Sequence, residues 1–206
     1  FNYMEANEFL GTMYGFDYLE TNDYSEAIYF LNRAIELGSE DAAINLSTIY
    51  RVTAQYDKGL SVLLNAIDSL GKADPQNVEL LSSTHGGLGH IYLEMGKYKE
   101  AETSYLKQLS SYKKLYDADS PELFDSYNNL ATFYSKINLL ERAQYYYGKI
   151  IKLVNLDSDF DTYYMVMNNF SIFESNRSKY KEAQLILEKL KFELVKKFGK
   201  GTPQLA

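Results

Sequence analysis

Lys97-Tyr98-Lys99-Glu100-Ala101 is one of five copies of an aromatic-led, polar phrase in this chain of 206 residues. Each copy ends in a small residue, which we call the anchor position. The anchors lie 32, 42, 42 and 40 residues apart, at Ala27, Gly59, Ala101, Ala143 and Ala183. Self-similarity in this range is typical of solenoids, which work through a long exposed surface. The sequence therefore predicts an array of stacked repeats, with binding as its first functional hypothesis.

Aligning the five copies on their anchors reveals two further matching positions. Twelve residues before the anchors the residue is always small: Gly15, Ser47, Gly89, Ala131 and Ser171. Nine residues before them stand Tyr18, Tyr50, Tyr92 and Tyr134, and then Glu174. Two small positions allow two antiparallel helices to approach closely, and the tyrosine fills the gap beside them. Glu174 breaks the pattern, which suggests a shift of one residue with Phe173 in the tyrosine's place.

The segments Leu88–Tyr92 and Leu130–Tyr134 resemble the Leu-Gly-x-x-Tyr half of the tetratricopeptide repeat. Leu115–Pro121 followed by Asn128–Tyr134 is similar to the longer repeats of kinesin light chains, with Ser120 where a histidine usually stands. This resemblance implies an all-α fold, a right-handed α–α superhelix of about five helix-turn-helix repeats. It also implies that the first helix of each repeat lines the concave face.

The repeat register and the turn formers predict where each helix lies. First helices are expected near 8–20, 41–53, 76–94, 121–136 and 162–175, and second helices near 24–37, 57–71, 98–116, 140–154 and 180–198. The repeats would span about 8–39, 40–81, 82–123, 124–163 and 164–202, forming a single array over 1–206. Pro203 follows Ala183 at the distance at which Pro121 follows Ala101, so 203–206 would open a further repeat. We therefore expect a fragment of a longer protein.

Composition narrows the class of partner. Residues 1–103 hold 6 Lys+Arg and 16 Asp+Glu (net −10), whereas residues 104–206 hold 15 and 12 (net +3). Nucleic-acid binding would need a basic stripe without so acidic a first half, so no nucleic-acid partner is expected. No apolar run has the length of a membrane span, so no membrane partner is expected either. The chain has no cysteine, which fits a reducing compartment, and we expect a cytoplasmic protein.

Asparagines recur on the predicted first helices. Asn45, Asn129 and Asn169 stand fourteen residues before their anchors, with Asn128 and Asn168 one place earlier. In arrays of the kind that this chain resembles, such asparagines face the groove and pair with a peptide backbone. The chemistry suits that role, because an amide offers one donor group and one acceptor group to a peptide unit. The alternative is that these side chains are solvated or bond to their own helix.

The same register predicts the neighbours of these asparagines in the groove. The expected peptide-binding residues, with the asparagines, are Asn45, Thr48, Arg51, His90, Asn128, Asn129, Thr132, Lys136, Asn168 and Asn169. Arg51 and Lys136 could meet a carboxylate of the ligand, or be plain surface charges.

No catalytic, cofactor or metal site is expected. The two histidines, His85 and His90, are five residues apart on one predicted helix, whereas metal-binding pairs need a spacing of three or four. We expect His85 to be a packing residue with its hydrogen bonds satisfied and His90 to line the groove.

The sequence therefore predicts a scaffold or adaptor, not an enzyme, that binds an extended peptide of a partner protein in its concave groove. A second hypothesis is a peptide-sensing regulatory arm whose catalytic or DNA-binding domain lies outside this segment. A third is self-assembly, with copies associating through their terminal repeats.

Overall fold

The computed structural model describes residues 3–17, 23–72, 77–154 and 160–199, with the backbone alone at 13–17 and 71–72. The regular structure of these residues is helical throughout. None of the helices they form combines the length and apolar character that crossing a bilayer requires. The chain divides into two compact units, Phe1–Leu115 and Tyr116–Ala206, and each is described by itself.

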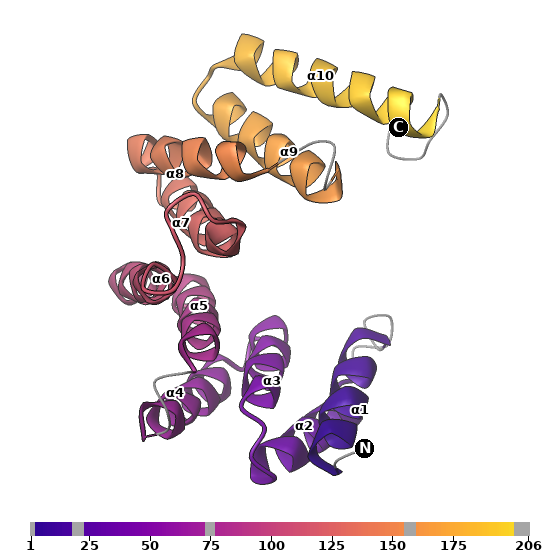
Figure 1. Ribbon diagram of the computed structural model, residues 1–206, viewed down its shortest axis with the longest axis vertical. Coiled ribbons are helices and arrows are strands. Elements are labelled where there is room, and N and C mark those ends of the chain that lie inside the picture. Colours follow the sequence, from indigo (N-terminus) through magenta and orange to yellow (C-terminus); the bar gives the residue numbers. More distant parts are fainter. Residues whose placement is uncertain (1–2, 18–22, 73–76, 155–159, 200–206) are drawn as a thin grey trace. The chain divides into compact units, whose positions relative to one another are not determined.

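The first unit consists of three helical hairpins, drawn in indigo to magenta in Figure 1. Its helices are α1 (Tyr3–Asp17), α2 (Ser25–Glu36), α3 (Asp41–Val52), α4 (Tyr56–Lys72), α5 (Val78–Glu94) and α6 (Tyr98–Tyr112). Each odd-numbered helix packs most extensively on the helix that follows it. The first helices α1, α3 and α5 also contact one another in succession, whereas successive second helices contact little or not at all. The first helices therefore form the shorter, concave side of this unit, and grooves open between the second helices.

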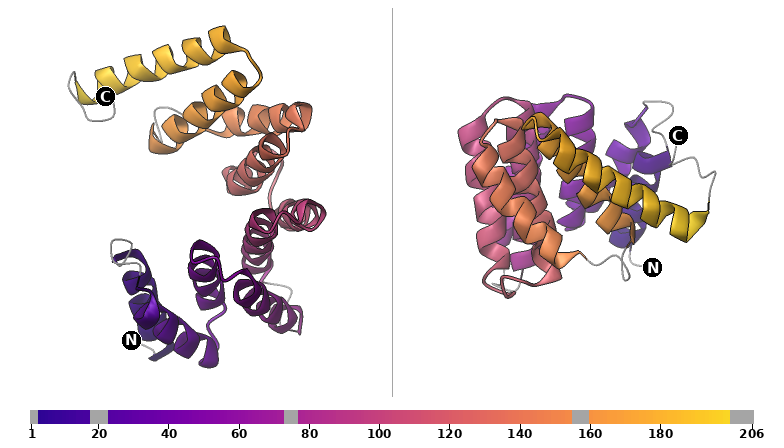
Figure 2. Two further views of the ribbon diagram at one scale, coloured as in Figure 1. Left: turned by 180° about the vertical axis from the view of Figure 1, so that it is seen from behind. Right: turned by 90° about the horizontal axis from the view of Figure 1, so that it is seen from above.

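The second unit contains two hairpins. A short 3₁₀ turn, η2 (Pro121–Leu123), leads into α7 (Phe124–Lys136), followed by α8 (Leu140–Leu153), α9 (Phe160–Asn176) and α10 (Tyr180–Phe198). The views from behind and from above show both hairpins as antiparallel pairs (Figure 2). Helix α8 also packs on α9, so the second hairpin stacks on the first as in the other unit.

One turn geometry recurs where the first helix of a hairpin leads into the second. Five residues before the anchor the backbone is left-handed, at Ala54 (φ 56°), Gly96 (φ 72°), Asn138 (φ 61°) and Ser178 (φ 61°). The next amide then donates back to a carbonyl five residues earlier, as from Lys97 to Tyr92 at 2.8 Å. This bond is the wide one of a Schellman motif, and it ends the first helix in the same way each time. The repeat in the sequence is thus a repeat of backbone geometry.

Small residues lie at the close approaches within the hairpins. The anchors Ala27, Ala101, Ala143 and Ala183 are buried, as are Ser47, Ala131 and Ser171 twelve residues before an anchor. A Cβ atom on Gly89 would lie 2.5 Å from Cε1 of Tyr105, and one on Gly59 would lie 2.7 Å from Cδ1 of Ile91. The smaller anchor Gly59 therefore leaves room for a buried isoleucine of the next repeat. Gly15 and Tyr18 of the first repeat lie outside the described side chains.

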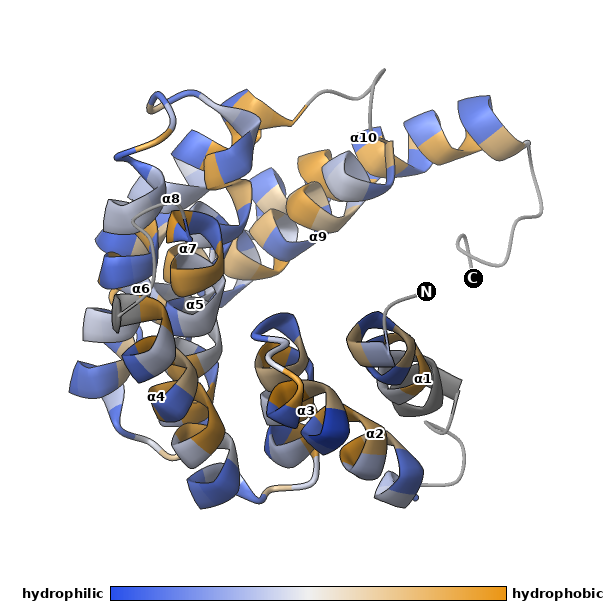
Figure 3. Cartoon of the chain, turned by 60° about the horizontal axis from the view of Figure 1, so that its bottom comes forward, coloured by the Kyte–Doolittle hydropathy of each residue, from blue (hydrophilic) through white to orange (hydrophobic). Residues whose placement is uncertain are grey.

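Aromatic rings fill the space between these close approaches. Tyr134 of α7 stacks on Tyr146 of α8 with ring centroids 5.7 Å apart. Tyr147 of α8 packs against Phe173 of α9 at 4.9 Å, which joins one hairpin to the next. Figure 3 shows apolar and polar residues interspersed around the helices. The many tyrosines of the chain therefore serve in good part as packing residues.

Glu174 corrects one expectation from the sequence. The amide of Lys179 donates to the Glu174 carbonyl at 2.9 Å, as the amide of Leu139 does to that of Tyr134, so the fifth repeat has no shift in register. Glu174 stands in the tyrosine's own place and is 3% exposed. Its carboxylate accepts from Arg177 at 3.2 Å and lies 3.7 Å from Nζ of Lys179. These two cations offset the free-energy cost of burying the charged carboxylate.

The helix boundaries agree with the prediction to within two residues except at three ends, while the predicted helix end at 20 and the further repeat expected at 203–206 lie outside the described residues. Helix α7 begins at Phe124 rather than at 121, because the 3₁₀ turn η2 precedes it. Helix α1 begins at Tyr3, five residues before the predicted start, and Asn7 donates to the Tyr3 carbonyl within this added turn. Helix α6 ends at Tyr112 rather than at 116. The connection that follows is held by the buried Tyr127, whose hydroxyl donates to the Ala118 carbonyl at 3.0 Å. This bond holds the connection against α7.

Candidate peptide-binding face

In the first unit, the predicted peptide-binding residues of α3 lie along one side of that helix, and Asn45 contacts the neighbouring first helix α1. Asn45, Thr48 and Arg51 are spaced by three residues, which places them on one side of the helix. The Asn45 amide donates to Oγ1 of Thr12 on α1 at 3.2 Å, and its carbonyl oxygen accepts no hydrogen bond from a described residue. The amide is thus oriented by the neighbouring first helix. Thr48 is exposed and donates to the carbonyl of Ile44 in its own helix at 3.2 Å.

His90 of α5 lies beside these residues of α3. Burial and, to a lesser extent, the charge of Arg51 lower the pKa of His90 to about 4, against an opposing effect of Glu94. Nδ1 of His90 is 3.0 Å from the Tyr105 hydroxyl, and the two rings meet edge to face. Burial also raises the pKa of Tyr105, so the phenol keeps its proton and the bond joins two neutral groups. His90 is therefore a neutral residue at pH 7 whose ring is held by Tyr105.

In the second unit α7 carries the next group of predicted residues. Asn128 and Asn129 are half-buried, and Oδ1 of Asn128 is fully buried without a hydrogen-bond partner among the residues that the structure describes. Thr132 donates to the carbonyl of Asn128 at 2.9 Å and to that of Asn129 at 3.1 Å, so its proton stays within the helix. Lys136 is exposed in the last turn.

Helix α9 carries the last pair of predicted asparagines. Asn168 and Asn169 are half-buried, and neither amide side chain bonds to another described residue. The Ser171 hydroxyl donates to the main-chain carbonyl of Asn168 at 2.7 Å, which leaves the side chain uninvolved. The local alternative considered from the sequence, in which the asparagines bond to their own helix, is therefore not what α9 shows.

The structure places the predicted residues in three sets, one in the first unit and two in the second. Asn45, Thr48, Arg51 and His90 share the first-helix side of the first unit, and Arg51 is close enough to His90 to affect its protonation. Asn128, Asn129, Thr132 and Lys136 share α7 of the second unit, and Asn168 and Asn169 share α9. The residues on α3 and α7 combine amides with a hydroxyl group and a cationic side chain, and the pair on α9 consists of amides. Such surfaces can hydrogen-bond a polar chain.

Sequence reasoning missed a groove on the opposite side of α5. His85 was expected to be a satisfied packing residue, but its Nδ1 atom is buried without a hydrogen-bond partner among the described residues. It lines a groove between α4 and α6 together with Lys99, Thr103 and Lys107. These three residues are four apart, so helical spacing alone could have placed them on one face.

Comparison with known proteins supports the assignment of the repeats. The sequence profile described as "Tetratricopeptide repeat" matches residues 79–155. No curated protein sequence matches the chain. A crystal structure of a kinesin light chain-like protein with nearly identical TPR-like repeats, from Podosopora anserina, is similar in fold with a TM-score of 0.68 at 16% identity. The similarity covers 93% of this chain and 98% of that one.

A second solved structure, BtubC (BKLC) from P. vanneervenii, has a TM-score of 0.67 at 17% identity, covering 98% of this chain and 77% of that one. At such low sequence identity, these similarities show the fold alone. They confirm the all-α class, an α–α superhelix, that was expected from the sequence. Residues 79–155 thus carry tetratricopeptide repeats, and the chain has the fold of tetratricopeptide arrays similar to those of kinesin light chains.

Proposed function

We propose that the protein is an interaction scaffold that binds an extended peptide of a partner along its first helices. The observation that carries this proposal is the state of the amide groups. Asn168 and Asn169 have no side-chain partner among the described residues, and Asn45 is oriented by Thr12 while its carbonyl oxygen stays unbonded. Half-buried amides without internal partners are suited to a ligand that supplies both a donor and an acceptor.

A peptide backbone is such a ligand. Each peptide unit offers one N–H and one C=O, so an asparagine can bind it in two bonds whatever its side chains are. The Arg51 guanidinium makes no hydrogen bond or ion pair with a described residue, so it is available to a carboxylate of the peptide. Glu94 lies near the same place, as its effect on the pKa of His90 indicates. The face is therefore mixed in charge, and it favours an uncharged or mixed segment over a strongly acidic tail.

The histidines support binding over catalysis. The chain has two, and burial lowers the pKa of each to about 4. A general base works best when its pKa lies near the operating pH, so neither imidazole is a good base at pH 7. A scaffold needs no such group.

A comparison of the peptide affinities of asparagine variants tests the proposal. Peptides would be selected from a random display library on the unmodified protein, and their affinities measured by calorimetry. Asn129→Ala combined with Asn169→Ala is expected to weaken binding by about 1–3 kcal/mol with unchanged helical circular dichroism. Asn65→Ala, at an exposed position of the second helix α4, serves as the control. Equal affinity of the double variant and the control would refute binding through these asparagines.

A second candidate function, self-association, rests on the last helix. Leu185 and Phe192 of α10 are 65% and 66% exposed, and they are seven residues apart on one side of the helix. A second copy could cover this apolar row. Sedimentation velocity would then show oligomers that Leu185→Lys with Phe192→Lys dissolves, whereas a monomer at all concentrations would exclude this function.

A further inference from the structure

The groove between the second helices α4 and α6 is built differently from the first-helix face. Its volume is about 460 Å³, and residues of α5 form its base. Its lining divides into an apolar part, from α4 and α5, and a charged part, from α6. His85 lies on α5 about 140° around the helix axis from His90, so the groove and the proposed peptide face lie on different sides of one helix.

His85 is the least satisfied group in this groove. Its Nδ1 atom is fully buried and has no hydrogen-bond partner among the residues that the structure describes. A buried polar atom left unpaired costs about 1–3 kcal/mol, so it needs an explanation. Burial, and then the positive charge of Lys107, lower the pKa of His85 to about 4. The imidazole is therefore neutral at pH 7 and can offer one N–H without adding charge.

The cations of the groove come from α6. Lys99 and Lys107 are exposed and line the groove, and neither ammonium group bonds to another described residue. Glu100 also lines the groove, directly after Lys99, and offsets the charge at that end. The hydroxyl of Thr103, midway between the lysines, donates to the Lys99 carbonyl at 2.9 Å. The uncompensated positive charge therefore lies at the end shared by Lys107 and His85.

The rest of the groove is apolar. Leu64 of α4 is 48% exposed, and Ile67 and Leu88 line the same space. Covering the exposed leucine with an apolar side chain removes apolar surface from water. The nearby lysines favour an anionic group close to that apolar side chain in the same ligand.

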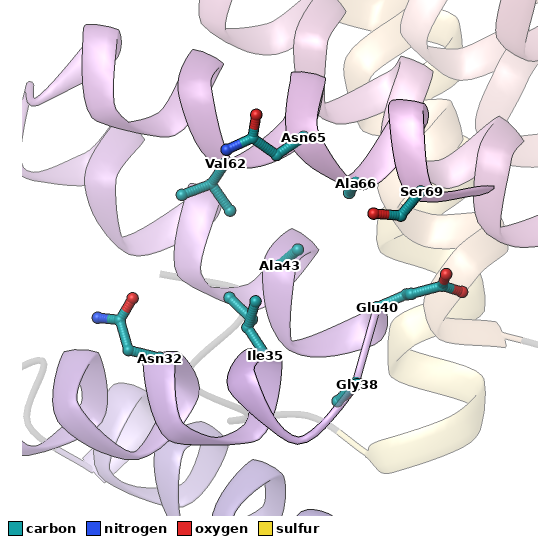
Figure 4. A pocket seen from close by; sticks show the side chains of 10 residues that line it. Asn32, Ile35, Gly38, Glu40, Ala43, Val62, Asn65, Ala66 and Ser69 are labelled. Carbon is teal, nitrogen blue, oxygen red and sulfur yellow. The ribbon is translucent and has the colours of Figure 1, made fainter. Parts of the chain in front are cut away.

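The equivalent groove one repeat earlier provides a comparison within the same unit. It lies between α2 and α4, encloses about 310 Å³, and is seen from close by in Figure 4. Its polar groups include Asn32 and Asn65, which Figure 4 shows on opposite helices, and its charged group is Glu40. No lysine or arginine lines it. The positive charge is thus a property of the α4–α6 groove and not of outer grooves in general.

We infer that the α4–α6 groove is a second binding site, which takes a partner's peptide segment with an acidic side chain next to large apolar ones. The carboxylate accepts a hydrogen bond from Lys107 and one from the Nε2–H of His85, and the apolar side chains cover Leu64 and Ile67. The inference is independent of the asparagines, so either site can fail without the other.

Imidazole NMR offers a direct test, because the chain has two histidines, one on each side of α5. The probe is the capped peptide acetyl-Ser-Glu-Leu-Phe-Ser-amide, added to ¹⁵N-histidine-labelled protein, with a twin carrying Gln in place of Glu. We expect the acidic peptide to shift the His85 ring signals and to leave those of His90 in place. The twin and the variant Lys107→Gln should each bind about tenfold more weakly.

Lys189→Gln, which removes an exposed lysine of α10, is the matched control and should bind as the unmodified protein does. Three results would overturn the inference. One is His85 signals that do not move at millimolar peptide. Another is equal binding of the acidic peptide and its twin. The third is a shift of His90 with His85 unmoved, which would place the peptide on the first-helix face.

Discussion

Gly89→Ala tests the close approach on which each hairpin depends. Gly89 lies inside α5, and the Cβ atom of an alanine there would meet three ring atoms of Tyr105, at 2.5, 2.6 and 2.8 Å. Tyr105 is 1% exposed, so its ring has little room to retreat. Its hydroxyl is also tied to Nδ1 of His90 at 3.0 Å. The added methyl group must therefore displace a buried ring and strain the bond that fixes His90.

The size of the effect follows from three contributions. Forcing a methyl group into a packed core costs about 1–3 kcal/mol, and losing the Tyr105–His90 hydrogen bond costs about 1 kcal/mol more. Alanine is better than glycine inside a helix by about 1 kcal/mol, which offsets part of the loss. We expect Gly89→Ala to lower the free energy of unfolding by about 1–3 kcal/mol.

Gly148→Ala is the matched control, because it makes the same change inside α8 where, apart from the backbone of its own helix and its chain neighbours, no described atom lies within 4 Å of the new Cβ. It should raise the free energy of unfolding by about 1 kcal/mol. Urea unfolding followed by circular dichroism measures both, and the His90 ring signals report on the Tyr105 bond. A Gly89→Ala protein as stable as Gly148→Ala would show that the two helices do not approach as described.

Two further predictions concern the turns and the histidine. Ala54→Gly should stabilise the protein by about 1 kcal/mol and Gly96→Ala should destabilise it by about 1–2 kcal/mol, because both residues are left-handed and alanine strains there; thermal midpoints that move in the same direction would contradict this. The pKa of His90 falls from 6.5 to about 4 on folding, so between these values the unfolded state binds more protons and stability falls as the pH falls. His90→Gln should lessen this loss by roughly 2–3 kcal/mol at pH 4, measured by urea unfolding at several pH values, and an unchanged pH profile would refute it.

The sequence predicts the hairpins well because the same physical constraint recurs in every copy. Small residues at the anchor and twelve places before it are needed wherever two helices nearly touch, as Gly89 and Ala101 show. The turns were harder to predict. Glycine and asparagine often adopt the left-handed backbone conformation, as Gly96 and Asn138 do here. Ala54 and Ser178 seldom would, and they adopt it because the turn of each repeat requires this conformation at that position.

The hydrogen-bond and ion-pair partners of the buried polar groups could not be predicted from the sequence. Glu174 looked like a break in register because a carboxylate seldom replaces a buried tyrosine. It keeps the register because Arg177 and Lys179 lie against it. His85 looked like a satisfied packing residue, and its unpaired Nδ1 depends on a groove formed by three helices. Such pairings arise from tertiary contacts that one helix's pattern does not contain.

Side-chain amide NMR tests the central claim, that asparagines of the first helices hold a peptide backbone. ¹H–¹⁵N spectra of asparagine-labelled protein would be recorded with and without a peptide selected on it. The account predicts that the NH₂ signals of Asn168 and Asn169 move and sharpen while those of Asn32 and Asn65, on second helices, stay in place. Signals that move at Asn32 and Asn65 but not at Asn168 and Asn169 would contradict it.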